Sequence, residues 1–180
     1  MSEIKAYVES IFDELVAIRR DIHAHPEVGM TEVRTSALIR AELEKMGMDE
    51  VQSPLPTAVV GLLHGGKGPG KCVAFRADID ALPVHEETGL PFASQNEGVM
   101  HACGHDMHAA VLFGVLKTFA EAPDFRGTLF GLFQPGEECN PGGASLVLAE
   151  KPFEGYDVRA VVGEHVEPQL EVGTLGFRAG

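Results

Sequence analysis

The amino-acid sequence predicts an α/β fold in which helices flank a mixed, mainly parallel sheet. Segments with helical spacing of apolar residues alternate with short segments that are almost wholly apolar, as buried strands are. The chain has 180 residues, of which 44% are hydrophobic. This length suffices for one domain with a sizeable core, but hardly for two.

The first half of the chain is expected to form two helices and then two strands. Apolar residues recur at helical spacing over 3–23, and Thr31 caps a second helix that ends at Gly47. Apolar runs at 57–64 and 72–77 predict strands. We interpret the stretch GGKGPG between them as a hairpin turn, because a phosphate-binding loop would be followed by a helix.

The second half begins with a long irregular segment. Residues 78–103 show no clear period and are expected to form a loop, and loops of that length are usually functional. The apolar pattern then predicts a helix over 105–121. The remaining expected elements are a strand at 127–134, a short helix around 143–150, a strand at 159–166 and a strand at 174–178.

Charge and composition exclude several classes of protein. With 14 basic and 27 acidic residues the formal net charge is -13, which opposes binding of nucleic acid. No apolar run approaches the roughly 20 residues of a membrane span. The N-terminus is amphipathic and acidic, unlike a signal peptide, so we expect a cytoplasmic protein. Three cysteines do not make a disulfide framework and are expected to be thiols or metal ligands.

The stretch MHACGHDMH carries the densest metal-site chemistry. It places Cys103, His105 and Asp106 beside His101 and His108, immediately before a predicted helix. Thiolate, imidazole and carboxylate groups hold transition metals in proteins. Taken alone, the stretch is equally compatible with a buried cysteine beside solvated histidines, and Asp106 with a carboxylate at a helix N-terminus.

Two more candidate groups follow predicted strands. Glu137 and Glu138 come after the strand at 127–134, and His165 lies at the end of a later one. Sites in open α/β sheets lie beyond the carboxyl ends of strands, and adjacent glutamates can divide metal ligation from proton transfer. An acidic turn and a core histidine are the alternatives. The charges of 76–80 are either an ion pair or support for metal ligands.

These motifs together resemble the M20 metallopeptidase family, in its amidohydrolase branch of hippurate hydrolases, N-acyl-amino-acid amidohydrolases and auxin-conjugate hydrolases. The resemblance implies a zinc-exopeptidase-like, phosphorylase/hydrolase-like α/β fold. The matching segments span almost the whole chain and are jointly specific. They are 19–36, 76–94, 100–110, 132–138 and 163–180.

The resemblance implies a site for two divalent metal ions, which are zinc, manganese, cobalt or nickel. The implied ligands are Cys103, which bridges both ions, His105, Glu138 and His165. Glu137 is implied as the general base, and Asp78 as a residue that supports the ligands from behind. The sequence departs from the family pattern at 139–141, where Gly usually follows the glutamates, and at Glu164, where Leu is common. Neither departure removes a ligand.

The implied activity is hydrolysis of the amide bond in N-acyl amino acids, such as hippurate, or in small peptide-like substrates, by metal-activated water. The expected partner is this small-molecule substrate, with no nucleic acid and no membrane. The rival hypotheses are a catalytically inert metal-binding or assembly fragment and a thiol hydrolase using Cys103 or Cys139.

Length is the largest departure from the family. Residues 1–180 resemble the N-terminal portion of the catalytic domain. The lid or dimerisation domain and the C-terminal catalytic segment, which brings one more ligand histidine, are absent from this sequence. We therefore expect a sheet that is incomplete at its C-terminal side, and self-association into a homo-oligomer through uncovered edges.

Overall fold

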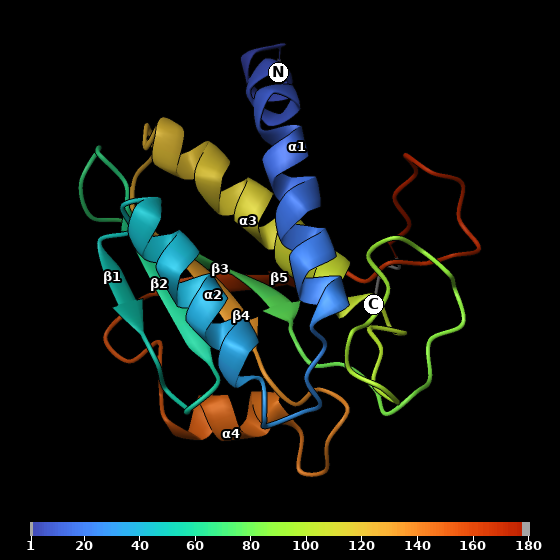
Figure 1. The fold of residues 1–180 in the computed structure, drawn as a ribbon. Helices are drawn as coiled ribbons and strands as arrows, with labels where there is room; N and C mark the ends of the chain where they lie inside the picture. The colour runs from blue at the N-terminus through green and yellow to red at the C-terminus, as the bar shows by residue number, and fades with distance from the viewer. Residues whose placement is uncertain (1, 178–180) are drawn as a thin grey trace.

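The computed structural model describes residues 2–177, which form a five-stranded sheet covered by four helices (Figure 1). The order of strands across the sheet is β1-β2-β4-β3-β5. Strands β3, β4 and β5 are parallel, whereas β2 is antiparallel to both of its neighbours. The mixed α/β fold expected from the sequence is confirmed. The strands are β1 (Glu50–Gln52), β2 (Val59–His64), β3 (Cys72–Asp78), β4 (Thr128–Gln134) and β5 (Val158–Gly163).

Helices cover both faces of this sheet, which is why its central strands are apolar at nearly every position. Helices α1 (Ser2–Ala24), α2 (Val33–Lys45) and α3 (His105–Glu121) lie on one face, and α4 (Gly143–Ala149) lies on the other (Figure 1). All seven residues of β4 are buried. The larger core cluster lies under the three long helices and includes Ile22, Ile39, Phe113 and Phe133.

The expected hairpin between the second and third strands is wrong. Strand β4 lies between β2 and β3 and pairs with both. The glycine-rich stretch instead hydrogen-bonds to the segment that precedes β4. The Gly65 N–H donates to the Gly127 carbonyl (2.9 Å), and the Gly66 N–H donates to the Pro123 carbonyl (2.7 Å). A Cβ at Gly65 would lie 2.2 Å from the Phe125 carbonyl oxygen, so glycine is needed for this approach.

The start of α2 also differs from the expectation. The residue that precedes the helix is Glu32 rather than Thr31, and its side chain makes no capping hydrogen bond. The carboxylate of Glu27 caps the helix from outside, accepting the N–H groups of Arg34 (2.9 Å) and Thr35 (2.8 Å). The predicted stop at Gly47 is confirmed, because its φ of 76° is left-handed.

The C-terminal part differs most from the sequence-based expectation. Strand β5 ends at Gly163, short of residue 166, and residues 174–177 form no strand, while residue 178 lies outside the described residues. The short strand β1 was not expected. Strand β5 lies at the sheet edge with Val161 58% and Val162 44% exposed. Within residues 2–177, no helix combines the length and apolar character needed to span a membrane.

Candidate metal centre

The three parallel strands end at one edge of the sheet, and each is followed by candidate site residues. Strand β3 leads into the segment containing Asp80, β4 into Glu137 and Glu138, and β5 into His165. The N-terminus of α3 reaches the same edge and carries His105. Parallel pairing therefore gathers residues that are far apart in the sequence.

Around His105, potential ligand atoms cluster in three overlapping groups, each with all its atoms within 4.8 Å of one another. The groups are Cys103, His105 and His165; His105, Glu137 and Glu138; and Asp78, His105 and His108. The structure thus brings together all four ligands expected from the sequence, the expected base and Asp78. His108 is an addition to this set.

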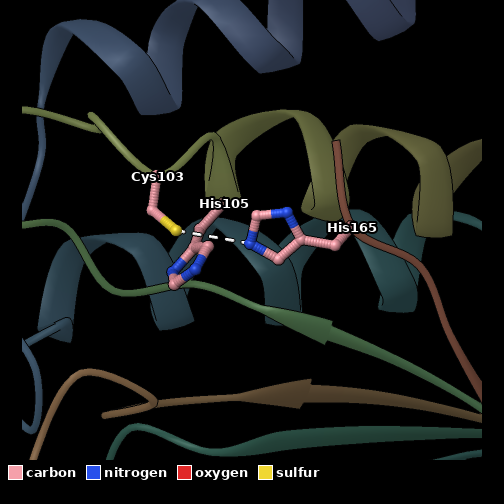
Figure 2. Close-up of side chains that lie close together, drawn as sticks. All are labelled: Cys103, His105 and His165. Carbon is pink, nitrogen blue, oxygen red and sulfur yellow. Dashed lines mark hydrogen bonds between the residues drawn. The ribbon is translucent and has the colours of Figure 1, made fainter. Parts of the chain in front are cut away.

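Cys103 and His165 face each other across this centre (Figure 2). The Cys103 Sγ atom lies 3.3 Å from His165 Nε2. Because His165 Nδ1 donates to the Val166 carbonyl (2.8 Å), the lone pair of this imidazole is on Nε2 and points to the thiol. Cys103 is half-buried and His165 is exposed, so an ion can reach both side chains.

His105 is held in the orientation and tautomer of a metal ligand. Its Nδ1 lies 2.8 Å from the backbone oxygen of Asp80 and 3.3 Å from Asp80 Oδ1, so the ring proton is on Nδ1. The opposite nitrogen, Nε2, is buried and has no hydrogen-bond partner among residues 2–177. Leaving a buried acceptor unpaired is costly, and a metal ion at Nε2 would satisfy it. The donor set therefore fits a transition metal.

Asp80 is the carboxylate that organises this part of the site, a role that the sequence left open among the charges of 76–80. Its Oδ2 accepts the N–H of Glu138 at 3.0 Å while its other atoms hold His105. Burial raises the pKa of Asp80, but the hydrogen bonds from His105 and from the N–H groups of Glu138 and Glu137 outweigh it and lower the pKa. Asp80 is thus kept ionised.

Asp78, which was expected to support the ligands, pairs with Arg76 and faces His108. The guanidinium of Arg76 is hydrogen-bonded to Asp78 Oδ1, and Asp78 Oδ2 lies 3.7 Å from His108 Nδ1. The ion pair, one of the two readings open for 76–80, is therefore present, while the histidine that Asp78 faces is not one of the expected ligands.

The turn that carries Glu137 and Glu138 is anchored by a residue that sequence reasoning missed. Glu32 is buried and accepts the Gly136 N–H at 2.8 Å. Burial raises the pKa of Glu32 despite this bond. Gly136 has a φ of 59°, and a Cβ there would lie 2.6 Å from Met30 Cε. The two glutamates themselves are exposed, so the anchor holds the turn while their carboxylates stay accessible.

Burial and acidic neighbours determine the protonation of Cys103. Burial is the largest cause that raises the pKa of this thiol to about 11, followed by its hydrogen bond to the Glu138 carboxylate and by the charges of Glu138, Glu137 and Asp78. The metal-free thiol is therefore protonated near neutral pH and is a poor nucleophile. A bound cation reverses this balance of charge, which couples metal binding to proton release.

Two other histidines of the MHACGHDMH stretch are buried, contrary to the solvated alternative. His101 is 4% exposed, and neither of its ring nitrogens has a hydrogen-bond partner in the described part of the chain. Burial lowers the pKa of His101 to about 4, so this ring is neutral. His108 is 1% exposed and packs edge-to-face on His165, with ring centroids 4.6 Å apart.

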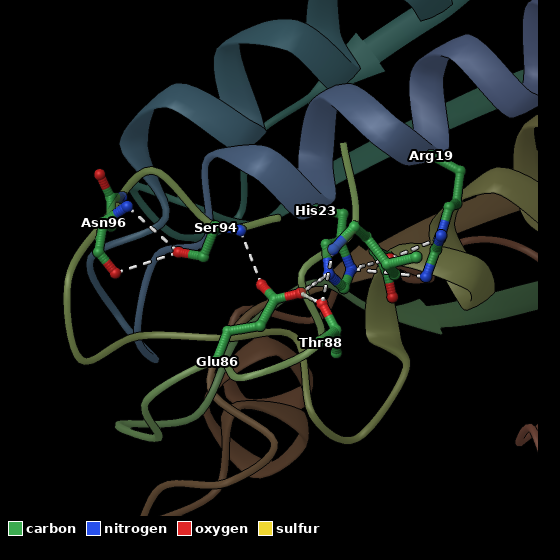
Figure 3. Close-up of polar contacts among 8 residues, drawn as sticks. Arg19, His23, Glu86, Thr88, Ser94 and Asn96 are labelled. Atoms are coloured by element: carbon green, nitrogen blue, oxygen red, sulfur yellow. Dashed lines mark hydrogen bonds and ion pairs between the residues drawn. The ribbon is translucent and has the colours of Figure 1, made fainter. Parts of the chain in front are cut away.

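Asp106 belongs to none of the metal-ligand groups. It joins a polar network that includes Arg19 and His23 of α1 (Figure 3). Its Oδ2 forms an ion pair with Arg19 Nε (2.7 Å) and a hydrogen bond with His23 Nδ1 (2.8 Å). The other nitrogen of His23 contacts Glu86 at 3.2 Å, and Glu86 accepts the Ser94 N–H at 2.6 Å. This network ties the long loop to α1 and to the start of α3.

Comparison with known proteins identifies relatives of this chain. Residues 74–180 match the peptidase family M20/M25/M40. The N-acyl-L-amino acid amidohydrolase of Geobacillus stearothermophilus is 43% identical over 179 residues, which are 99% of this chain and 48% of that protein. The N-acetyl-L-cysteine deacetylase of Bacillus subtilis is 42% identical over 168 residues, 93% of this chain and 39% of that protein.

A solved structure shares both the fold and the sequence. The Bacillus subtilis YXEP protein, described as a dinuclear metal binding peptidase from the M20 family, has a TM-score of 0.89 and 40% identity, covering 96% of this chain and 48% of that one. The chain spans about half the length of these relatives. The family match covers more than half of the chain and includes every candidate ligand, so the chain belongs to the peptidase family M20/M25/M40.

Proposed function

We propose that this chain carries the metal centre of an amidohydrolase that cleaves the amide bond of N-acyl amino acids or of small peptide-like substrates, with hippurate-like compounds included. In this proposal residues 1–180 are part of the metal-dependent catalytic domain. The observation that carries it is the clustering of three other expected ligands, Cys103, Glu138 and His165, around His105, whose buried Nε2 is unpaired within residues 2–177. The substrates named for the amidohydrolase and deacetylase relatives support the substrate class.

Cys103, His105, Glu138 and His165 would hold two divalent ions of zinc, manganese, cobalt or nickel. The thiolate and imidazole groups favour borderline-soft ions, while the carboxylate also accepts harder ones such as manganese. Bound ions supply Lewis-acid chemistry, because they lower the pKa of water and polarise a carbonyl oxygen. The structurally similar YXEP protein, described as a dinuclear metal binding peptidase, supports this stoichiometry.

Glu137 would act as the general base. Its exposed carboxylate stands beside the ligand cluster and can take a proton from the attacking water, then deliver a proton to the leaving amine. Glu138 differs from it, because the Glu138 carboxylate hydrogen-bonds to the Cys103 thiol, whereas Glu137 acts on that thiol only through its charge. In this proposal the two adjacent carboxylates have different tasks: Glu137 transfers protons and Glu138 binds metal.

A hydrolysis assay tests this function. The chain, loaded with each of the four metals in turn, is incubated with N-acetyl and N-benzoyl amino acids, with and without a chelator. Hydrolysis that the chelator abolishes supports the proposal. Activity that survives the chelator but is lost on thiol alkylation would instead establish the thiol hydrolase.

Metal binding without turnover is the second candidate, favoured by one observation. His165 is exposed and follows an edge strand whose valines are uncovered, so solvent is open to the site on this side. Catalysis gains from positioned groups that exclude water and orient the substrate. A longer chain, extended to the full length of the relatives, is the comparison. If it hydrolyses N-acyl amino acids and this metal-loaded chain does not, the second candidate describes these residues.

A further inference from the structure

His165 belongs to a segment that has few attachments to the rest of the chain. Beyond β5, residues 164–177 form neither helix nor strand, and all of them are exposed except the half-buried Val166. Within residues 2–177, this segment makes two hydrogen bonds outside itself. One joins His165 Nε2 to Cys103 Sγ (3.3 Å), and the other joins the Val166 N–H to His108 Nε2 (3.2 Å). The second involves none of the four expected ligand side chains.

The contact at His108 defines the state of that ring. A backbone N–H is a donor only, so His108 Nε2 must carry the lone pair and the ring proton must be on Nδ1. Nδ1 faces Asp78 Oδ2 at 3.7 Å, and Asp78 is in turn paired with Arg76. With Nε2 occupied by an N–H and Nδ1 protonated, neither nitrogen of His108 is available to a metal ion.

The side chain of Val166 is seated beside the same helix start. A Cβ at Gly104 would lie 2.5 Å from Val166 Cγ2, so Val166 occupies space that only glycine leaves free. Gly104 has a φ of 87°, which also favours glycine. Val166 follows His165 directly in the chain. Both its N–H and its side chain thus contact the beginning of α3.

We propose that His108 is a positioning residue that accepts the Val166 N–H and thereby directs the imidazole of His165 toward Cys103 and His105. This role rests on the proposed metal centre, in which His165 is a ligand. The edge-to-face packing of the two rings at 4.6 Å restricts His165 from a second side. His108 contributes to metal affinity through His165 alone.

Two substitutions of His108 distinguish the effect of its hydrogen-bond acceptor from the effect of its side-chain volume. His108→Leu keeps a similar volume and removes the acceptor, whereas His108→Gln places an amide oxygen near the position of Nε2. In metal-free protein, amide hydrogen exchange at Val166 should be faster in His108→Leu and close to wild type in His108→Gln. Co²⁺ titration followed by absorbance should show an affinity loss of about 10–100-fold for His108→Leu and little loss for His108→Gln.

Controls keep the test specific. His64→Ala removes a histidine that contacts Thr128 Oγ1 at 3.0 Å, at the opposite end of β4 from the metal centre, and should change neither readout. His108→Asn, whose shorter side chain does not reach Val166, replaces His108→Leu if the apolar variant fails to fold. Equal Val166 exchange in wild type and in the variant without an acceptor would overturn the proposal.

A double-mutant cycle distinguishes this role from ligation and from the proposed function itself. In a His165→Ala background, His108→Leu should cause no further loss of Co²⁺ affinity. A further loss as large as in wild type would show that His108 acts independently and would overturn the positioning role. If His165→Ala weakens Co²⁺ binding and His108→Leu does not, the positioning role alone is wrong. If His165→Ala leaves Co²⁺ binding unchanged, the ligand assignment fails, and the positioning role falls with it.

Discussion

Asp80 shows how one buried carboxylate connects two parts of the site. The backbone oxygen of Asp80 accepts from His105 Nδ1 and fixes the tautomer of that ring, while the carboxylate lies 3.3 Å from the same nitrogen and accepts the backbone N–H of Glu138 through Oδ2. A metal-ligating histidine commonly needs such a partner on its other nitrogen, because the partner sets which nitrogen carries the lone pair. The geometry at His105 therefore exists before any ion binds.

Replacing each of the two adjacent glutamates by glutamine is expected to remove a different property of the site. In a chain that turns over substrate, Glu137→Gln should keep its metal and lose about 10²–10⁴-fold in kcat, because an amide cannot relay a proton. Glu138→Gln should lose metal instead. Metal analysis after dialysis, combined with kcat, checks both. Normal turnover of N-acyl amino acids by Glu137→Gln would show that the roles are assigned wrongly.

Glu32 should make folding stability depend on pH in a definite direction. Burial raises its pKa in the folded state above the ordinary value of 4.5. The folded state therefore binds the proton more tightly, so the contribution of Glu32 to the free energy of unfolding falls as the pH rises from 4.5 to the folded pKa. Glu32→Gln keeps an acceptor for Gly136 but carries no charge.

The stability gain of Glu32→Gln over wild type should consequently grow with pH across this window. Urea unfolding at a series of pH values measures it. A difference between the two proteins that is the same at every pH would contradict the assigned cause.

Among the elements, α4 sets the position of the turn that carries the glutamates. The Gly143 N–H, at the first residue of α4, donates to the Gly136 carbonyl at 2.8 Å. A Cβ at Gly143 would lie 1.7 Å from the Pro135 carbonyl oxygen, so the helix and the turn meet in backbone contact. Any side chain at Gly143 must push them apart.

Gly143→Ala should therefore destabilise the fold by about 1–3 kcal/mol, as overpacking does, and disturb metal binding through the turn. Gly142→Ala is the matched control, because its Cβ would meet nothing nearer than the Cys139 carbonyl oxygen at 3.7 Å. Thermal unfolding and metal titration of both variants measure the effect. Equal stability of the two variants would refute the contact.

The helices and buried strands could be predicted because their signals are local. The helix expected at 105–121 coincides with α3, and the apolar run at 127–134 became β4. Strand pairing could not be predicted in the same way. The local sequence around GGKGPG is compatible with a hairpin, and only the position of β4 between β2 and β3 excludes it. Strand β1 is too short for its pattern to stand out.

Site residues could be predicted where their chemical type suggested a role. They could not be predicted where the role depends on burial in the folded chain. Cys103, His105 and the glutamates were found as chemically suggestive residues, and the structure gathers them, while their roles stay predictions. Glu32 looked like any exposed acid near a helix start, and nothing in its neighbours along the chain indicates that it reaches Gly136. Such long-range hydrogen bonds depend on the tertiary fold.

For the whole molecule, the uncovered strand β5 is the feature most relevant to behaviour in solution. One of its edges pairs with β3, and Val161 and Val162 on its two faces are exposed. An unpaired, apolar edge strand is a template for pairing with another chain. We therefore expect this chain to self-associate through β5 in a concentration-dependent way.

Val161→Lys should shift the chain toward monomer, because a charge on an edge strand opposes pairing. Leu148→Lys, on α4 and 59% exposed, is a control of similar exposure outside the edge. Sedimentation velocity over a range of concentrations measures the association. A monomer at all concentrations, or equal effects of the two variants, would refute the role of β5.

The metal centre itself is tested most directly by counting bound ions. Wild type and Cys103→Ser are each dialysed against zinc or manganese and analysed for metal. The account predicts that wild type retains metal and that Cys103→Ser loses much of it, because the thiolate is the softest of the ligands gathered around His105. Equal metal content in the two proteins, or none in either, would contradict it.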